Sequence, residues 1–266
     1  MTRSGTTGNQ RPAAGRRRKG RPASRRDRLP DRLWLYGLHT VEAALANPRR
    51  DVRRLVVTRN ALARLTSADV QPKVAPEQMS PHEIDRIVGA GAVHQGIAAE
   101  VAPLEPLTLD RLAAARLVIV LDQITDPHNV GAILRSALAF AADAVVTTRR
   151  YAPAETGVLA KAASGALDAI PLIAVTNLAR ALGEMGHMGL TRIGLAGDAP
   201  APFESALSGD RLALVFGAEG KGLRQLTRQT CDLLARLAVP GPLTSLNVSN
   251  AAAVALYVAR RHLGEP

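Results

Sequence analysis

The sequence has little cysteine, few aromatic residues and no long hydrophobic run. The single cysteine, Cys231, cannot form an intrachain disulfide, so we expect it to be a small packing residue. The six histidines form no HxxxH or HExxH pair, and we therefore expect no metal. No apolar run approaches the roughly 18 to 20 residues of a membrane span, and no secretory h-region is present. These absences predict a cytoplasmic protein without a membrane partner.

Two common nucleotide-binding motifs are also missing. The loop Gly217-Ala218-Glu219-Gly220-Lys221-Gly222 lacks the Walker spacing, because Gly222 stands where Ser or Thr should follow the lysine. A GxGxxG dinucleotide fingerprint occurs nowhere in the chain. The loop is therefore not a phosphate loop, although its glycines allow the backbone to pass close to a cofactor.

The positive charge of the chain is concentrated at its beginning. The formal net charge is +11, but residues 1–30 hold ten basic residues and a single acidic one, Asp27, which leaves +2 for residues 31–266. This segment lacks large apolar residues from Thr2 to Arg28, so we expect a disordered tail. It is either a phosphate-binding arm for RNA, a solvated tail or an organelle transit peptide. The residues of the RNA-binding interpretation are Arg16, Arg17, Arg18 and Lys19.

Two α/β units follow the tail. With 47% apolar residues, the chain can form one large or two modest cores. The segment Pro103 to Thr108 holds two prolines and no long apolar run, as a linker does. We therefore expect one domain over residues 31–104 and another over 105–266. In the second, apolar runs alternate with helical segments, which predicts a parallel sheet with strands at 117–121, 144–147, 169–174, 190–196, 212–216 and 236–239.

Three junctions in the second domain place polar residues between a strand and a helix. They lie in the segments 117–140, 212–232 and 240–261. Ligands of α/β proteins bind beyond the carboxyl ends of strands, so we expect the three loops to meet in one crevice. In the last junction, Asn247 or Ser249 can cap the following helix.

These segments resemble the three motifs of the SpoU/TrmH family of S-adenosylmethionine-dependent RNA ribose 2′-O-methyltransferases. Asn129 and Arg135 match the first motif, Glu219 the second, and Ser245-Leu246-Asn247 the third. The spacer Lys161 to Leu182 resembles the branch that methylates a guanosine of bacterial 23S ribosomal RNA. The resemblance covers nearly the whole chain.

The resemblance implies an architecture that the residue pattern alone does not. It implies an RNA-binding domain similar to ribosomal protein L30e over residues 31–104, with GLHTVEAAL and HQGIAAEV as its recognisable pieces. It further implies a SPOUT α/β-knot domain with a trefoil knot over residues 105–266, and a homodimer. S-adenosylmethionine is expected between the second and third motif loops, at Gly217, Val239 and Leu246. Without the resemblance, Leu246 would be interpreted as a core leucine and Val239 as the end of a buried strand.

Each candidate catalytic residue also has a structural interpretation. Arg135 is either a helix-surface arginine or a group that anchors substrate phosphate and stabilises a developing alkoxide. Glu219 either organises the loops, accepts a proton or is a solvated carboxylate. Asn129 can be the N-cap of its helix. Ser245 and Asn247 are expected to orient the ribose hydroxyl or the loops around it.

The leading hypothesis is 2′-O-methylation of a guanosine in 23S ribosomal RNA. An alternative keeps the chemistry but takes transfer RNA, although simple members of that branch lack the N-terminal α/β unit. A third hypothesis is a noncatalytic ribosomal RNA-binding assembly factor, against which the intact motif residues argue.

The substitution Arg135→Lys tests the role of the guanidinium. Lysine keeps the positive charge but loses the planar, bidentate donor geometry, so we expect much of the RNA binding to remain and turnover to fall. Filter binding and methyl transfer with labelled cofactor measure the two effects. Equal turnover of the two proteins would contradict the proposed role.

Overall fold

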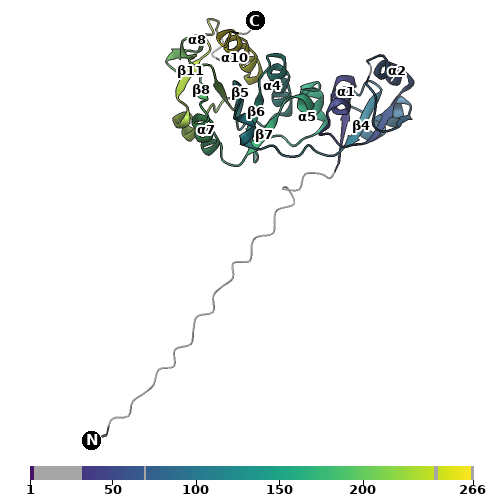
Figure 1. The fold of residues 1–266 in the computed structure, drawn as a ribbon, viewed down its shortest axis with the longest axis horizontal. Helices are drawn as coiled ribbons and strands as arrows, with labels where there is room; N and C mark the ends of the chain where they lie inside the picture. Colours follow the sequence, from purple (N-terminus) through teal and green to yellow (C-terminus); the bar gives the residue numbers. More distant parts are fainter. Residues whose placement is uncertain (3–31, 69, 243–244, 265–266) are drawn as a thin grey trace.

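The chain folds into two neighbouring α/β units, each built around its own sheet. The computed structural model describes residues 1–2, 32–68, 70–242 and 245–264. The basic tail, with Arg16, Arg17, Arg18 and Lys19, lies outside the described residues. In Figure 1 the smaller unit lies to the right of the larger one, and helix α5 lies between them.

The smaller unit contains a mixed, four-stranded sheet in the order β1-β4-β2-β3. Strand β4 pairs antiparallel with both β1 and β2, whereas β3 is parallel to β2. Helix α3 has a complete capping box between Ser80 and Glu83. The strands are β1 (Leu33–Tyr36), β2 (Val52–Val57), β3 (Pro76–Gln78) and β4 (Ile97–Val101), and the helices are α1 (Leu38–Ala46), α2 (Arg59–Ser67) and α3 (Pro81–Val88).

The larger unit contains a seven-stranded sheet, parallel throughout, in the order β7-β6-β5-β10-β8-β11-β9. A short 3₁₀ helix, Leu109–Leu112, precedes it. The strands are β5 (Leu117–Asp122), β6 (Ala144–Thr148), β7 (Leu172–Val175), β8 (Thr191–Leu195), β9 (Ala201–Pro202), β10 (Leu212–Gly217) and β11 (Leu233–Arg236). The helices are α4 (Pro127–Ala139), α5 (Gly157–Ala163), α6 (Ala166–Ala169), α7 (Leu178–His187), α8 (Phe203–Ala206), α9 (Gln225–Thr230) and α10 (Val248–His262).

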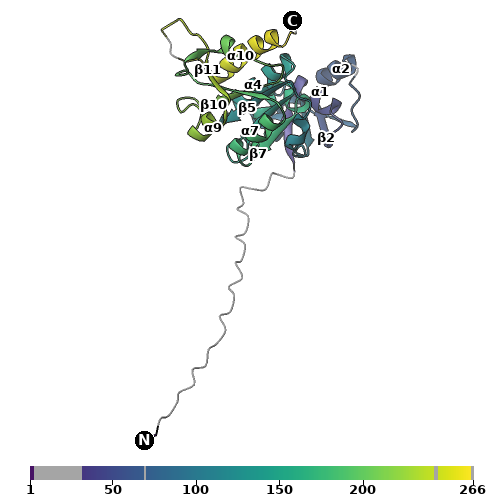
Figure 2. The same ribbon diagram turned by 60° about the vertical axis from the view of Figure 1, so that its left-hand side comes forward.

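Both faces of this sheet are covered, which explains why its central strands are apolar throughout. All six residues of β5 are buried. Alternate residues of β5 belong to two core clusters: Ile119 packs with α4, α5 and α10, whereas Val120 packs with α7. The turned view in Figure 2 shows α4 and α7 together with the central strand β5. The prediction of an α/β fold with a parallel sheet is confirmed.

Two expected strands lie elsewhere in the structure. The run predicted at 169–174 begins only at Leu172, because the preceding residues complete helix α6 and Pro171 follows. The run predicted at 236–239 is shifted to Leu233–Arg236, where β11 pairs with β8 and β9. The apolar stretch from Leu233 to Val239 does not itself distinguish these registers. The L30e likeness and the trefoil knot stay predictions.

Helix α10 is attached to the end of α4 by a buried arginine. The Arg260 guanidinium donates to the Phe140 carbonyl at 2.5 Å and to the Ala141 carbonyl, just beyond the last residue of α4. A cation at this end of a helix pairs with carbonyls that lack an intrahelical partner.

In the described ranges, no helix is long and apolar enough to cross a membrane.

We expect Arg260→Met to lower the free energy of unfolding by about 1–3 kcal/mol, because the part-buried carbonyls of Phe140 and Ala141 lose their donor while the side-chain volume is retained. The neighbouring substitution Arg261→Met is the matched control, with an expected loss within about 0.5 kcal/mol, since Arg261 is exposed and its described side-chain contacts are with the exposed Tyr257. Urea unfolding measures both. Equal losses would show that the carbonyl contacts do not stabilise the packing of α10 on α4.

Candidate active site

The carboxyl ends of three parallel strands border one pocket of about 590 Å³. Leu195 ends β8, Gly217 ends β10, and the segment after β11 supplies Leu237 and Val239. Strands β6 and β7 lie on one side of β5, whereas β10 and the strands beyond it lie on the other side. A crevice is expected at the carboxyl edge of the sheet near such a change of direction. The remaining lining residues include Phe216, Ala218, Glu219, Gly220, Gly222, Ser245, Leu246, Asn247, Val248 and Ala251.

All three residues predicted to contact a cofactor line this pocket. Gly217 ends β10, Val239 lies in the segment after β11, and Leu246 comes from the segment before α10. The Leu246 side chain is exposed rather than packed in the core, with a relative exposure of 37% for the residue. The apolar wall and the adjacent backbone groups suit a ligand that has both a flat apolar part and polar edges.

The Glu219 carboxylate joins the three motif segments. Its Oε1 accepts from Asn247 Nδ2 at 2.6 Å and from Asn129 Nδ2 at 3.3 Å. Asn247 Nδ2 also donates to Asn129 Oδ1 at 3.0 Å. The three side chains are 28 to 118 residues apart in the sequence and form one hydrogen-bonded triangle. The expected convergence of the three loops is therefore present.

Helix starts position both asparagines. Asn247 is the N-cap of α10, and its Oδ1 accepts from the Ser249 backbone N–H at 2.9 Å. This leaves Nδ2 directed to Glu219. Asn129 lies in the first turn of α4. The interpretation of Asn129 as the N-cap of this helix is wrong. Asp126 has that role, accepting from the His128 N–H at 3.1 Å, so the Asn129 amide remains available to the site.

Arg135 and Ser245 occupy different positions relative to the pocket. Ser245 lines it. Arg135 is exposed on α4 and does not line it, and no ion pair involving Arg135 occurs among the described residues. The structure thus brings together five of the six motif residues and places the arginine outside the cavity. The other candidates are Asn129, Glu219, Leu246 and Asn247.

An ion pair that the sequence analysis missed supports the loop carrying Glu219. Asp122, the last residue of β5, is fully buried and accepts from Arg224 Nε at 2.7 Å and from the Arg224 N–H at 3.1 Å. Between Gly217 and Arg224 the loop folds back on itself, with Gly222 N–H donating to the Ala218 carbonyl at 2.8 Å. An aspartate that ends an apolar parallel strand was the available sequence signal.

Potential metal ligands and one thiol occur in the described part of the chain. No group of three or more His, Cys, Asp or Glu side chains is arranged to hold a metal ion there. Burial raises the pKa of the Cys231 thiol to about 11, so the thiolate is scarce near neutrality. Cys231 packs against the core cluster on the α7 side of the sheet, in agreement with a packing role.

Comparison with known families assigns both units. A model described as the SpoU rRNA Methylase family matches residues 116–257, which contain the pocket and the hydrogen-bonded triangle. A model described as RNA 2'-O ribose methyltransferase substrate binding matches residues 34–107. The chain belongs to the SpoU rRNA methylase family.

Two sequence relatives and one solved structure show what the chain is similar to within this family. The 23S rRNA (guanosine-2'-O-)-methyltransferase RlmB of Pseudomonas putida is 40% identical over 240 residues, which cover 85% of this chain and 95% of that protein. The RlmB of Pseudomonas aeruginosa is 40% identical over 236 residues, with coverage of 84% and 94%. The SpoU methyltransferase AviRb of Streptomyces viridochromogenes, solved in complex with AdoMet, has a TM-score of 0.73 at 22% identity and covers 87% of this chain and 90% of its own. The last comparison shows the fold.

We expect Gly217→Ala to weaken S-adenosylmethionine binding at least about tenfold, because a Cβ there would lie 2.2 Å from the Gly222 backbone carbon and displace the loop. Gly241→Ala is the matched control, since a Cβ at that position meets no atom within 4 Å. Isothermal titration calorimetry measures both affinities. Unchanged affinity of Gly217→Ala would exclude this loop from the cofactor site.

Proposed function

We propose that the chain transfers a methyl group from S-adenosylmethionine to the ribose 2′-oxygen of a guanosine in 23S ribosomal RNA. The observation that carries this proposal is the 40% identity to RlmB proteins over 84–85% of the chain and 94–95% of theirs. Membership of the SpoU rRNA methylase family supports the reaction class.

The lining of the pocket suits the chemistry of S-adenosylmethionine. Its lining combines apolar side chains with backbone groups of the Gly217–Gly222 loop and the Glu219 carboxylate. Bound there, the cofactor supplies an electrophilic methyl group on a sulfonium. The ribose 2′-oxygen would take this methyl group, S-adenosylhomocysteine would leave with the electron pair of the broken carbon–sulfur bond, and the hydroxyl proton would pass to water. Gly217, Val239 and Leu246 are the residues to which we assign cofactor contact.

The motif side chains position the ribose rather than react with it. A ribose hydroxyl is a weak nucleophile, so much of the acceleration comes from alignment with the methyl group. Glu219 accepts from both asparagine amides, and this fixes their orientation. We therefore assign Glu219 as an organiser of the site, with Asn129, Ser245 and Asn247 orienting the hydroxyl. Arg135, exposed on α4 and outside the cavity, is assigned to anchoring substrate phosphate.

We assign different functions to the two units. We assign RNA binding to residues 31–104 and methyl transfer to residues 105–266. The family model for substrate binding, which matches residues 34–107, supports this division. The tail over residues 1–30 adds a nonspecific phosphate-binding arm, as its excess of arginine indicates.

We further propose that the protein works as a homodimer in the cytoplasm. Leu138 on α4 and Val254 and Tyr257 on α10 are 43–49% exposed. These helices pack against each other, so their apolar side chains form a surface that a second copy can cover. Ribosomal RNA as substrate supports the cytoplasmic location.

The experiment that tests the proposal is methylation of unmodified 23S transcript with labelled S-adenosylmethionine, run in parallel with transfer RNA. We expect 2′-O-methylguanosine in the 23S transcript alone. Label only in transfer RNA would establish the alternative substrate. Cofactor binding without label in either RNA would contradict the proposed activity on free transcripts. Light scattering measures the oligomeric state of the same preparation.

Replacing Asn247 tests the site assignment. We expect Asn247→Ala to lower turnover by about 10²- to 10⁴-fold, the range typical of a positioned group acting on the reacting proton or oxygen. Loss of the α10 cap should cost only about 1 kcal/mol of stability, so the protein should remain folded by circular dichroism. A fully active Asn247→Ala protein would remove the assignment.

A further inference from the structure

The two units share one continuous hydrophobic core, so the linker is not their only connection. Buried residues of the smaller sheet and of α1, such as Leu35 and Val41, belong to the same cluster as Leu159 of α5 and Ile119 of the larger sheet. Strand β1 packs on α5, and α1 packs on α6. The backbones approach so closely at Gly157 that a Cβ there would lie 2.6 Å from the Trp34 carbonyl oxygen.

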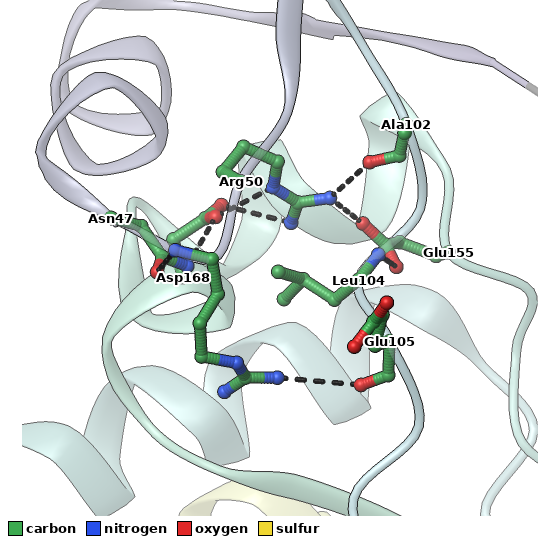
Figure 3. Close-up of polar contacts among 8 residues, drawn as sticks. Asn47, Arg50, Ala102, Leu104, Glu105, Glu155 and Asp168 are labelled. Carbon is green, nitrogen blue, oxygen red and sulfur yellow. Dashed lines mark hydrogen bonds and ion pairs between the residues drawn. The ribbon is translucent and has the colours of Figure 1, made fainter.

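A buried arginine of the smaller unit is bonded to carboxylates of the larger one. The Arg50 side chain is 0% exposed, and its Nε and Nη2 donate to the two carboxylate oxygens of Asp168 at 2.7 and 3.2 Å. Its Nη1 donates to Glu155 at 2.5 Å and to the Ala102 carbonyl at 3.0 Å. Figure 3 shows the guanidinium between the two carboxylates, with Asn47 also bonded to Asp168.

Burial by itself would lower the pKa of Arg50, but the hydrogen bonds and charge of Asp168, with those of Glu155, outweigh it and raise the pKa. The guanidinium therefore stays charged. Moving the units apart would separate the Arg50 guanidinium from the Asp168 carboxylate. Each of these buried charged groups would then lack a partner until water solvates it. Such a separation is costly, because breaking a buried pair exposes an uncompensated charge to an apolar environment.

The connecting segment is bonded at Leu104 and Glu105 as well. The Leu104 N–H donates to the Glu155 carboxylate at 3.2 Å, and Arg49 Nη2 donates to the Glu105 carbonyl at 3.3 Å. On the other side of the interface, Gln95 Oε1 accepts from Lys161 Nζ at 2.9 Å and from the Leu38 N–H at 3.2 Å. Contacts at both sides resist rotation about the linker.

We propose that Arg50 and Asp168 are positioning residues that hold the substrate-binding unit at a fixed place relative to the pocket, so that the geometry of the interface selects which nucleotide is methylated. This inference rests on the proposed function, since it takes RNA as the ligand of both units. An RNA held by the smaller unit presents to the pocket only those riboses that lie at the matching distance. Misplacement by about 1 Å can cost a factor of about 100 in rate, so a fixed arm discriminates between neighbouring nucleotides.

Two substitutions loosen the interface in different ways. Arg50→Lys keeps one positive charge but loses the fork that engages Asp168 and Glu155 together. Gly157→Val leaves the ion pairs intact and inserts a side chain against Trp34 and Tyr36. The matched controls are Arg180→Lys, at an exposed pair with Glu184, and Gly183→Val, where a Cβ meets no atom within 4 Å.

The measurement is the distribution of 2′-O-methylation over the 23S transcript, mapped for each full-length protein, together with calorimetric cofactor binding. We expect Arg50→Lys and Gly157→Val to bind S-adenosylmethionine as the wild type does. We expect the ratio of methylation at the main nucleotide to that at its neighbours to fall at least about tenfold. The controls should keep the wild-type ratio. Small-angle scattering should show a more extended average shape for the two interface variants.

The outcomes separate a positioning role from a structural one. An interface that serves only stability lowers the amount of active protein but leaves the ratio between nucleotides unchanged, and that result would overturn the proposal. If Gly157→Val fails to fold, the ratio for Arg50→Lys decides alone. If the wild type methylates no 23S transcript, the proposed function fails first. An unchanged ratio with an active wild type refutes only the role of the interface.

Discussion

The parallel pairing of β5 with β10 is the constraint on which the rest of the site depends. The two strands are in register from Leu117 and Leu212 to Asp122 and Gly217, so both motif loops leave the sheet at one edge. The buried Asp122 carboxylate then holds Arg224 at the far end of the second loop. A change in this pairing would move Glu219 away from Asn129, because the backbone between each strand and its motif residue is short.

The site is organised around hydrogen bonds between its loops. One carboxylate oxygen of Glu219 accepts from two amides and lies 3.5 Å from the Val248 N–H at the start of α10. Each loop therefore supports the other two. Such a network suits a reaction in which the protein aligns two bound molecules, since preorganised groups need not rearrange during transfer. Arg135, exposed on α4, is the exception to this convergence.

The interface between the two units is also held by directional hydrogen bonds between residues far apart in the sequence. Arg50, Asp168 and Glu155 satisfy one another only in one relative arrangement of the units, whereas the apolar contacts around them tolerate small shifts. Buried ion pairs add little net stability, but their directional geometry can specify a single arrangement. The two units thus share one hydrophobic core and a buried ion-pair cluster, and the apolar surface of α4 and α10 is left on the larger unit.

Local sequence determined most of the succession of strands and helices, the polar loops after β5 and β10, and a cap of α10 at either Asn247 or Ser249. These features depend on hydrophobic period, turn residues and helix starts, all of which act within a few residues. Only the tertiary structure decided that Asp126 rather than Asn129 caps α4, that Arg135 lies outside the pocket, and where β7 and β11 begin. It also decided the role of Arg50, which is paired with a carboxylate 118 residues away. No local pattern distinguishes such an arginine from a solvated one, because its partner is chosen by the path of the whole chain.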